Sequence, residues 1–174
     1  VCLMNYEKSS VIVRSRGYNL LELMTTVAIA GIVALIGIPL MASMIENARV
    51  RSVASDLTMA VSLARNEAVR QGADMLVLAA GTPADYDKGW CVVPAGADCE
   101  ADSLIRLFNP PGDVAFVTVP NNSTSMTFNR QGVNTDGTES VSVQPSTCTS
   151  GDNRARTMTI SPSGRPNVAA EACP

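Results

Sequence analysis

The chain has 174 residues, of which 46% are apolar and 17% are charged, with a formal net charge of −3. The length fits one globular domain with an extension. The absence of histidine argues against a zinc site and against His-dependent catalysis. The net acidity argues against broad attraction to nucleic acid or anionic lipid. We therefore expect no enzyme, no metal and no cofactor.

The N-terminal part reads as a membrane anchor. Residues 23–45 contain no charged side chain, and about 20 apolar residues are enough to cross a bilayer as a helix. The flank before them carries Lys8, Arg14 and Arg16. Positive flanks stay on the cytoplasmic side, which predicts a single-pass inner-membrane protein whose C-terminal part lies in the periplasm. The predicted membrane-spanning segment covers residues 20–44.

Glu22 stands at the start of this apolar segment. A carboxylate there is costly and usually has a function. The alternative is that Glu22 reaches the headgroup layer and has no particular role.

The helical pattern continues beyond the apolar segment. Apolar residues recur at spacings of three and four, which marks one face of an amphipathic helix; they are Val50, Val53, Leu57, Ala60, Val61, Ala64 and Ala68. Gly72 is a plausible stop signal, so we predict a stalk over residues 18–72 whose helix runs from Tyr18 to Gln71 and is about 80 Å long at 1.5 Å per residue. Pro39, together with Gly37, predicts a kink or a local opening.

Residues 73–174 are expected to form a β-rich head. Six basic and eleven acidic residues give this part a net charge of −5. Short runs rich in Val, Thr and Ile alternate with turn signals, which predicts an antiparallel sheet. The predicted strands are Met75–Ala79, Trp90–Val93, Leu104–Phe108, Ala115–Val119, Ser125–Asn129, Ser140–Val143 and Arg156–Ser161. With the amphipathic helix covering the sheet, the expected fold class is α+β.

Four cysteines follow the apolar segment: Cys91, Cys99, Cys148 and Cys173. Exported cysteines suit an oxidising compartment, although four cysteines allow three pairings. We favour Cys91–Cys99 as a local clasp and Cys148–Cys173 as a staple for the C-terminus. Free buried thiols are the alternative.

The residues Gly17-Tyr18-Asn19-Leu20-Leu21-Glu22-Leu23 resemble the class III signal of type IV prepilins. The resemblance implies that a prepilin peptidase removes residues 1–17 by cutting after Gly17 and methylates the new amine of Tyr18. It also implies that Glu22 neutralises the N-terminal ammonium of a neighbouring subunit, which would set axial register. The family usually has Phe and Thr where this chain has Tyr18 and Asn19. The competing interpretations are a secretory signal peptide cleaved after the apolar segment and a plain membrane anchor.

Two head segments carry a second resemblance. Met126-Thr127-Phe128-Asn129-Arg130-Gln131-Gly132 and Met158-Thr159-Ile160-Ser161-Pro162-Ser163-Gly164-Arg165 are similar to segments of GspH/FimT-type proteins, which are minor pilins and pseudopilins. The resemblance implies a pilin fold, in which a long N-terminal helix packs on an antiparallel sheet. It implies other major and minor pilins or pseudopilins as partners.

Three functions follow from this resemblance. The first, favoured by the match to the FimT/FimU side of the family, is a minor pilin of a type IV pilus, in the pilus or its tip complex. The second is a GspH-like minor pseudopilin of a type II secretion system. The third is a DNA-binding minor pilin, since DNA-binding members carry G-R-x-R near the C-terminus. Here Arg165 is present, but Asn167 replaces the second arginine. Arg154 and Arg156 are further candidates for phosphate contact; the alternative for Arg165 is a turn cap or an ion pair.

Two weaker patterns have simple interpretations. Asn134, Asp136 and Glu139 faintly suggest a calcium loop, but the full spacing of such a loop is missing, so we expect a turn. Tyr86 and Trp90 are either a contact patch or, as we expect, packing residues of the first hairpin.

Overall fold

The computed structural model describes residues 19–81, 84–112, 114–119 and 123–173. The predicted long helix is present as α1 (Leu20–Gln71, 52 residues), and the predicted start at Tyr18 lies outside the described residues. Gly72 follows with a positive φ of 64°, a conformation that glycine adopts at no steric cost and that commonly ends helices. The helix assignment runs without interruption through Gly37 and Pro39. The loosening predicted there for the filament stays a prediction.

The head contains eight strands, all paired antiparallel: β1 (Met75–Ala80), β2 (Asp85–Pro94), β3 (Arg106–Phe108), β4 (Val114–Val119), β5 (Ser125–Phe128), β6 (Glu139–Pro145), β7 (Ala155–Ile160) and β8 (Pro166–Glu171). The α+β class with antiparallel strands is confirmed. The strands form two four-stranded sheets rather than the one expected, in the orders β3-β2-β1-β5 and β4-β6-β7-β8.

Seven strands overlap the predicted ones, and β8 was not predicted. Its sequence, Pro-Asn-Val-Ala-Ala-Glu, has only one β-branched residue, and it opens with proline, which usually marks a turn. Proline is nevertheless tolerated as the first residue of a strand. Pro166 pairs with Ile160 at the tight turn through Gly164.

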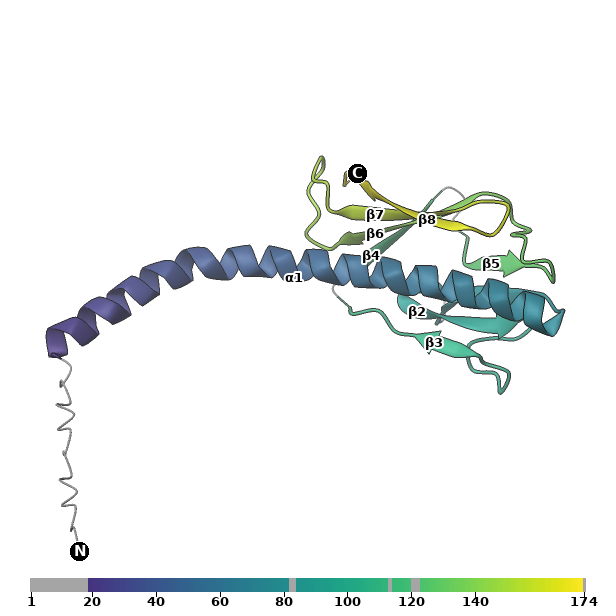
Figure 1. Cartoon of the computed structure of the whole chain (residues 1–174), viewed down its shortest axis with the longest axis horizontal. Helices are drawn as coiled ribbons and strands as arrows, with labels where there is room; N and C mark the ends of the chain where they lie inside the picture. Colours follow the sequence, from purple (N-terminus) through teal and green to yellow (C-terminus); the bar gives the residue numbers. More distant parts are fainter. Residues whose placement is uncertain (1–18, 82–83, 113, 120–122, 174) are drawn as a thin grey trace, which may run out of the picture. The chain divides into compact units, whose positions relative to one another are not determined.

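The head core lies between the C-terminal part of α1 and both sheets. Every residue of the predicted apolar stripe from Val50 to Ala68 is at most 1% exposed. The sheets contribute fully buried partners such as Trp90, Phe128 and Met158. Figure 1 shows α1 running along both sheets in the head, with β6 and β7 to one side and β2 and β3 to the other. The alanines at positions 60, 64 and 68 leave room for the helix backbone to approach the strands closely.

The described chain divides into two units between Met41 and Ala42. The C-terminal part of α1 therefore belongs to the head, where it supplies one face of the core. From here on, "head" means residues 46–174, which are the β-rich part together with the C-terminal part of α1, and "apolar segment" means the described part of residues 20–45.

Both disulfides have the pairing that we favoured from sequence. Cys91 in β2 is bonded to Cys99, with Cα atoms 5.5 Å apart, and Cys148 is bonded to Cys173, with Cα atoms 5.8 Å apart. The second bond closes a loop of 25 residues and holds the end of β8 against the β6–β7 connection. A disulfide typically contributes about 2–4 kcal/mol.

Candidate assembly interface

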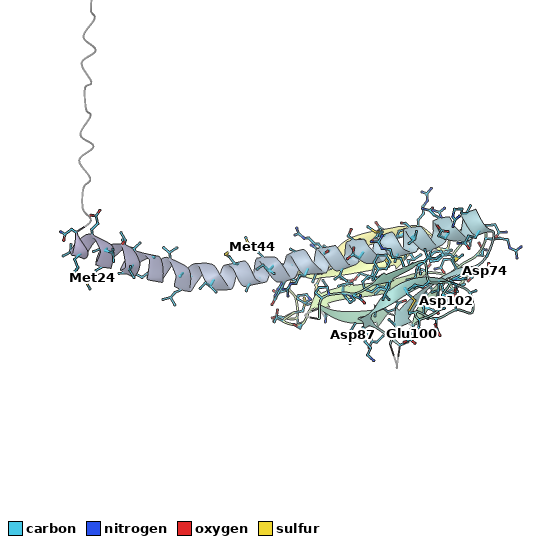
Figure 2. All side chains as sticks on the ribbon, turned by 90° about the horizontal axis from the view of Figure 1, so that it is seen from below. Met24, Met44, Asp74, Asp87, Glu100 and Asp102 are labelled. Atoms are coloured by element: carbon cyan, nitrogen blue, oxygen red, sulfur yellow. A yellow bond between two sulfur atoms is a disulfide. The ribbon has the colours of Figure 1, made fainter. Side chains whose placement is uncertain are left out.

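The apolar segment is a continuous exposed apolar surface in the described part of the chain. Each of its described large side chains is at least half exposed. The exposed fraction ranges from 50% at Ile45 to 78% at Leu35. Figure 2 shows Met24 and Met44 extending from the ribbon. Among the described helices, α1 is long and apolar enough to cross a membrane by length and composition. A soluble monomer rarely exposes an apolar surface of this extent, so another environment has to cover it.

Five small residues interrupt this surface between positions 28 and 37. A Cβ atom added at Gly31 or at Gly37 would meet no atom within 4 Å. Together with Ala28, Ala30 and Ala34, these glycines form a low stretch of helix surface. Small residues of this kind let helix backbones approach closely in an apolar medium.

Glu22 is exposed in the first turn of α1. Its backbone oxygen accepts a hydrogen bond of 2.9 Å from the Thr25 hydroxyl, while its carboxylate has no hydrogen bond or ion pair within the described residues. Among the described residues, nothing therefore neutralises the Glu22 carboxylate. Gly17 and Tyr18, the predicted cleavage and methylation site, lie outside the described residues.

A polar cluster joins α1 to the connection between β6 and β7. Arg154 Nη2 donates to Glu46 Oε2 at 2.5 Å, and the Thr147 hydroxyl donates to the same oxygen at 2.6 Å. Arg154 Nε donates to Asn47 Oδ1 at 3.0 Å. Hydrogen bonds from Thr147 and Arg154 lower the pKa of the Glu46 carboxyl. Glu46 is the first charge after the apolar segment, and it ties the helix to the disulfide-bonded loop around Cys148.

The two head segments that resemble the GspH/FimT family pack against each other. A Cβ on Gly164 would lie 2.3 Å from the Gly132 carbonyl oxygen, and one on Gly132 would lie 3.0 Å from Arg65 Cγ. Asn134 N donates to the Pro162 oxygen at 3.0 Å. These motifs therefore build a junction between two turns and the helix, and their glycines are required by close approach and by positive φ angles of 75° and 74°.

The three candidate arginines for DNA contact do not form one patch. Arg154 is engaged by Glu46 and Asn47, and Arg156 Nη1 donates to the oxygen of Ala155 at 2.8 Å. Arg165 is exposed, with its backbone N–H and oxygen bonded to Ser161. Arg154 precedes β7 and Arg165 follows its far end, so about 17 Å of strand, at about 3.3 Å per residue, separates them.

The two weaker patterns are parts of the fold. Tyr86 and Trp90 are buried in the core, as expected for packing residues. Asn134 is 3% exposed and donates from Nδ2 to the Gly137 oxygen, while Asp136 Oδ2 accepts the Thr127 N–H. These bonds describe a turn. Within the described residues, no group of three acidic, cysteine or histidine side chains is arranged to hold a metal ion.

Sequence reasoning missed two features of this surface. The Glu46–Arg154 contact joins residues 108 apart, and no local pattern reports such a pairing. The edge strand β8 was missed because its two alanines have a low strand propensity. A signal for β8 was nevertheless present, because the Ser163-Gly164 turn directly before it predicts a partner strand for β7.

Comparison with known proteins identifies the family. A family model described as type II transport protein GspH matches residues 53–164, from the buried face of α1 to the Gly164 turn. No sequence among curated proteins matches the chain.

Two solved structures have a similar fold. The type IV minor pilin FimU of Pseudomonas aeruginosa (strain PAO1) superposes with a TM-score of 0.55 and 20% identity, covering 68% of this chain and 91% of FimU. The minor pseudopilin EpsH from the type 2 secretion system of Vibrio cholerae superposes with a TM-score of 0.52 and 12% identity, covering 70% of this chain and 97% of EpsH. Because the family match spans more than half of the chain, this protein belongs to the GspH family of minor pilins and pseudopilins.

Proposed function

We propose that this chain is a minor pilin of a type IV pilus, incorporated into the pilus or its tip or priming complex to support assembly. The observation that carries the proposal is the exposed apolar segment, which continues as one helix into the folded head. In a bilayer, a helix satisfies its own backbone hydrogen bonds. After extraction, the same surface packs against the helices of other pilins. Little free energy needs to separate the two states because both surroundings are apolar.

The proposal includes a processing step before assembly. A prepilin peptidase removes residues 1–17 and methylates Tyr18, in the inner membrane with the head in the periplasm. The two disulfides support an oxidising compartment for the head. The Glu22 carboxylate is exposed and has no partner within the described residues, which supports its pairing with the N-terminal ammonium of a neighbouring pilin.

A minor pseudopilin of a type II secretion system is the second candidate, supported by the EpsH-like fold. Higher identity with FimU, 20% against 12%, favours the pilus. DNA binding has less support, because the head is acidic and its candidate arginines are dispersed or engaged. Three or four separate arginines would give weak, salt-sensitive binding.

The processing step is tested by intact-mass spectrometry of the chain from its native host, with and without the prepilin peptidase. The expected mass lacks residues 1–17 and includes one added methyl group, and both changes depend on the peptidase. A cut after Ala42, or an uncut chain in the presence of the peptidase, would remove the basis of the proposal.

The choice between the two filaments is tested by deleting the gene and measuring two outputs in parallel. A pilus role predicts loss of surface pili with normal export of type II secretion substrates, and restoration of pili by the intact chain. The opposite pattern assigns the chain to the secretion system. Complementation with the Glu22→Val variant provides an assembly-defective control made from the same chain.

A further inference from the structure

Strand β8 is an unprotected edge of the second sheet. It pairs with β7 on one side, and no other strand of the described chain pairs with it. Five of its six residues are exposed. Natural edge strands are usually protected by lysine, an internal proline or a bulge. β8 has its one proline at the first position and its one charged residue, Glu171, at the last, so the N–H and C=O groups on the outer side of residues 167–170 remain open to another strand.

The helix leaves the inner face of β8 uncovered. Val168 lies opposite Met158, so both side chains stand on the sheet face toward α1. Met158 is fully buried, and its sulfur lies 3.8 Å from the Thr58 hydroxyl of α1. Val168, one strand further out, is 40% exposed. The result is an open groove of about 320 Å³ between α1 and β8; it is lined by Arg51, Ala54, Ser55, Thr58, Arg156 and Val168.

The groove combines an apolar floor with positive charge. Arg51 is exposed and has no hydrogen-bond or ion-pair partner within the described residues. Arg156 follows the same alternation as Met158 and so stands on the face toward α1, where it also lines the groove. None of the six lining residues is acidic. The acidic side chains Asp87, Glu100 and Asp102 belong to β2 and the segment after it, which are parts of the other sheet region (Figure 2).

These features identify the kind of partner that fits. Open backbone groups along β8 favour an extended peptide, which adds to a sheet edge through main-chain hydrogen bonds. An apolar side chain can pack on the floor at Ala54 and Val168. The two arginines can donate hydrogen bonds to a carboxylate. On one side of an added strand, side chains recur at every second residue, so a segment whose acidic and apolar residues stand two positions apart presents both kinds of side chain to the groove.

We propose that β8 and this groove bind an extended acidic segment of the head of a neighbouring pilin-type subunit, which adds to the second sheet as its fifth strand. The inference rests on the proposed function, because it requires assembly beside other pilin heads. It goes beyond that function in assigning the contact to the head rather than to the apolar segment alone. It also assigns the specificity to Arg51 and Arg156.

The contact is tested with the full chain in its native host by replacing Val168 with the photo-crosslinker p-benzoylphenylalanine. The matched control is the same replacement at Val133, which is also 40% exposed but does not line the groove. Illumination of whole cells should crosslink position 168, and not position 133, to another pilin-type subunit. Mass spectrometry should map the attachment to an extended acidic segment of that subunit's head. Attachment to a stalk helix, a second copy of this chain or nucleic acid would overturn the proposal.

The role of charge is tested by combining the crosslinker at position 168 with Arg51→Glu or Arg156→Glu. Each variant should lower the crosslink yield at least about fivefold, since a like charge replaces an attractive one at the contact. The control Arg130→Glu makes the same charge change at an exposed turn residue outside the groove. An unchanged yield in both groove variants, with the Arg130→Glu yield also unchanged, would contradict the role of the arginines. Melting temperatures of the variants establish whether each head is folded.

A parallel measurement separates failure of this inference from failure of the proposed function. Sheared filaments are probed for the chain in the same cells. A chain present in pili but without a crosslink at position 168 overturns the inference and leaves the pilus role intact. A crosslink to a pseudopilin head, with no chain in pili, supports the inference and moves the function to the secretion system.

Discussion

The two parts of α1 are both rich in apolar residues, but they differ in how those residues are spaced. In the apolar segment, side chains such as Leu35, at 78% exposure, point outward on every side of the helix. In the head, one stripe of apolar residues faces the core, and Leu57 on that stripe is fully buried, whereas Met59 and Val69 lie off the stripe and are exposed. Charged residues fill the remaining faces there, including exposed Arg51 and Arg70.

The difference shows that total hydrophobicity and its periodicity carry separate information. A helix that is apolar all round has no preferred face for its own domain, so its surroundings must be lipid or other helices. A striped helix is committed to the core of its own head. One chain therefore uses a single helix for assembly at one end and for folding at the other, and substitutions in the two parts should have different consequences.

The largest effect is expected at Glu22, in the apolar segment. Glu22→Val should reduce incorporation into filaments at least about tenfold, because a neighbour's N-terminal ammonium would remain unpaired in an apolar bundle, where a lost partner costs about 3–5 kcal/mol. Membrane insertion and the melting temperature of the head should not change. Quantitative immunoblots of sheared filaments and membranes provide the measurement. Thr25→Val, one turn later on the helix, is the control, and normal incorporation of Glu22→Val would refute charge pairing.

The same substitution in both parts of the helix tests the comparison directly. Leu57→Ala removes a fully buried side chain and should lower the free energy of unfolding of the head by about 2–5 kcal/mol. Leu35→Ala changes a side chain in the apolar segment that is 78% exposed and should leave that free energy within about 0.5 kcal/mol. Urea unfolding of the full chain in detergent, followed by Trp90 fluorescence, measures both. Equal losses would show that the two parts do not play separate roles.

A smaller effect is expected at the junction of the two family motifs. Gly164→Ala should destabilise the head by about 1–3 kcal/mol, because the new Cβ would meet the Gly132 oxygen at 2.3 Å. Gly137→Ala is the matched control, since Gly137 also has a positive φ, 89°, but nothing within 4 Å of the added Cβ. The difference between the two variants in the same urea experiment isolates the close contact from the backbone strain. If both variants lose the same amount, the contact between the two turns contributes nothing.

The sequence predicted those parts of the fold that depend on local patterns. The stripe from Val50 to Ala68 predicted the helix and its buried face. Gly72 predicted the end of the helix at Gln71. Alternating short runs established seven strands, because each strand and its turn lie within a few residues. The division into two sheets depends instead on pairings between strands that are not consecutive, β1 with β5 and β4 with β6, and no local pattern carries that information.

Of the candidate interface, the sequence predicted the apolar segment and Glu22, but it did not predict the groove beside β8. An uncharged segment and a single acid at its start are features of composition, so the sequence alone indicated the membrane anchor and Glu22. The groove beside β8 required three elements to meet: the helix face at Arg51, the inner face of β7 at Arg156, and an alanine-rich edge strand. The sequence offers Arg156 for phosphate contact, whereas in the structure it lines the groove together with Arg51 and Val168.

The smallest effect is expected at Glu46, at the boundary between the two parts of the helix, and it should depend on pH. Hydrogen bonds from Thr147 and Arg154 lower the folded-state pKa of this carboxyl below its ordinary value of 4.5. Its contribution to stability is therefore present above about pH 4.5 and is lost as pH falls through the lower folded-state pKa. Glu46→Gln should be less stable than the wild type at pH 7 and indistinguishable from it at sufficiently low pH, in chemical unfolding at each pH.

Glu139 supplies a control with the opposite sign. Burial raises the pKa of the Glu139 carboxyl, and Oε2 has no hydrogen-bond partner within the described residues. Its contribution is therefore most favourable below pH 4.5 and is lost as pH rises through the folded-state pKa. Glu139→Gln should gain stability relative to the wild type as pH rises, whereas Glu46→Gln should lose it. If the stability difference from the wild type changes with pH in the same direction for both variants, the Arg154–Glu46 contact does not stabilise the packing of the helix against the disulfide-bonded loop. The buried stripe alone would then keep α1 packed on the sheets.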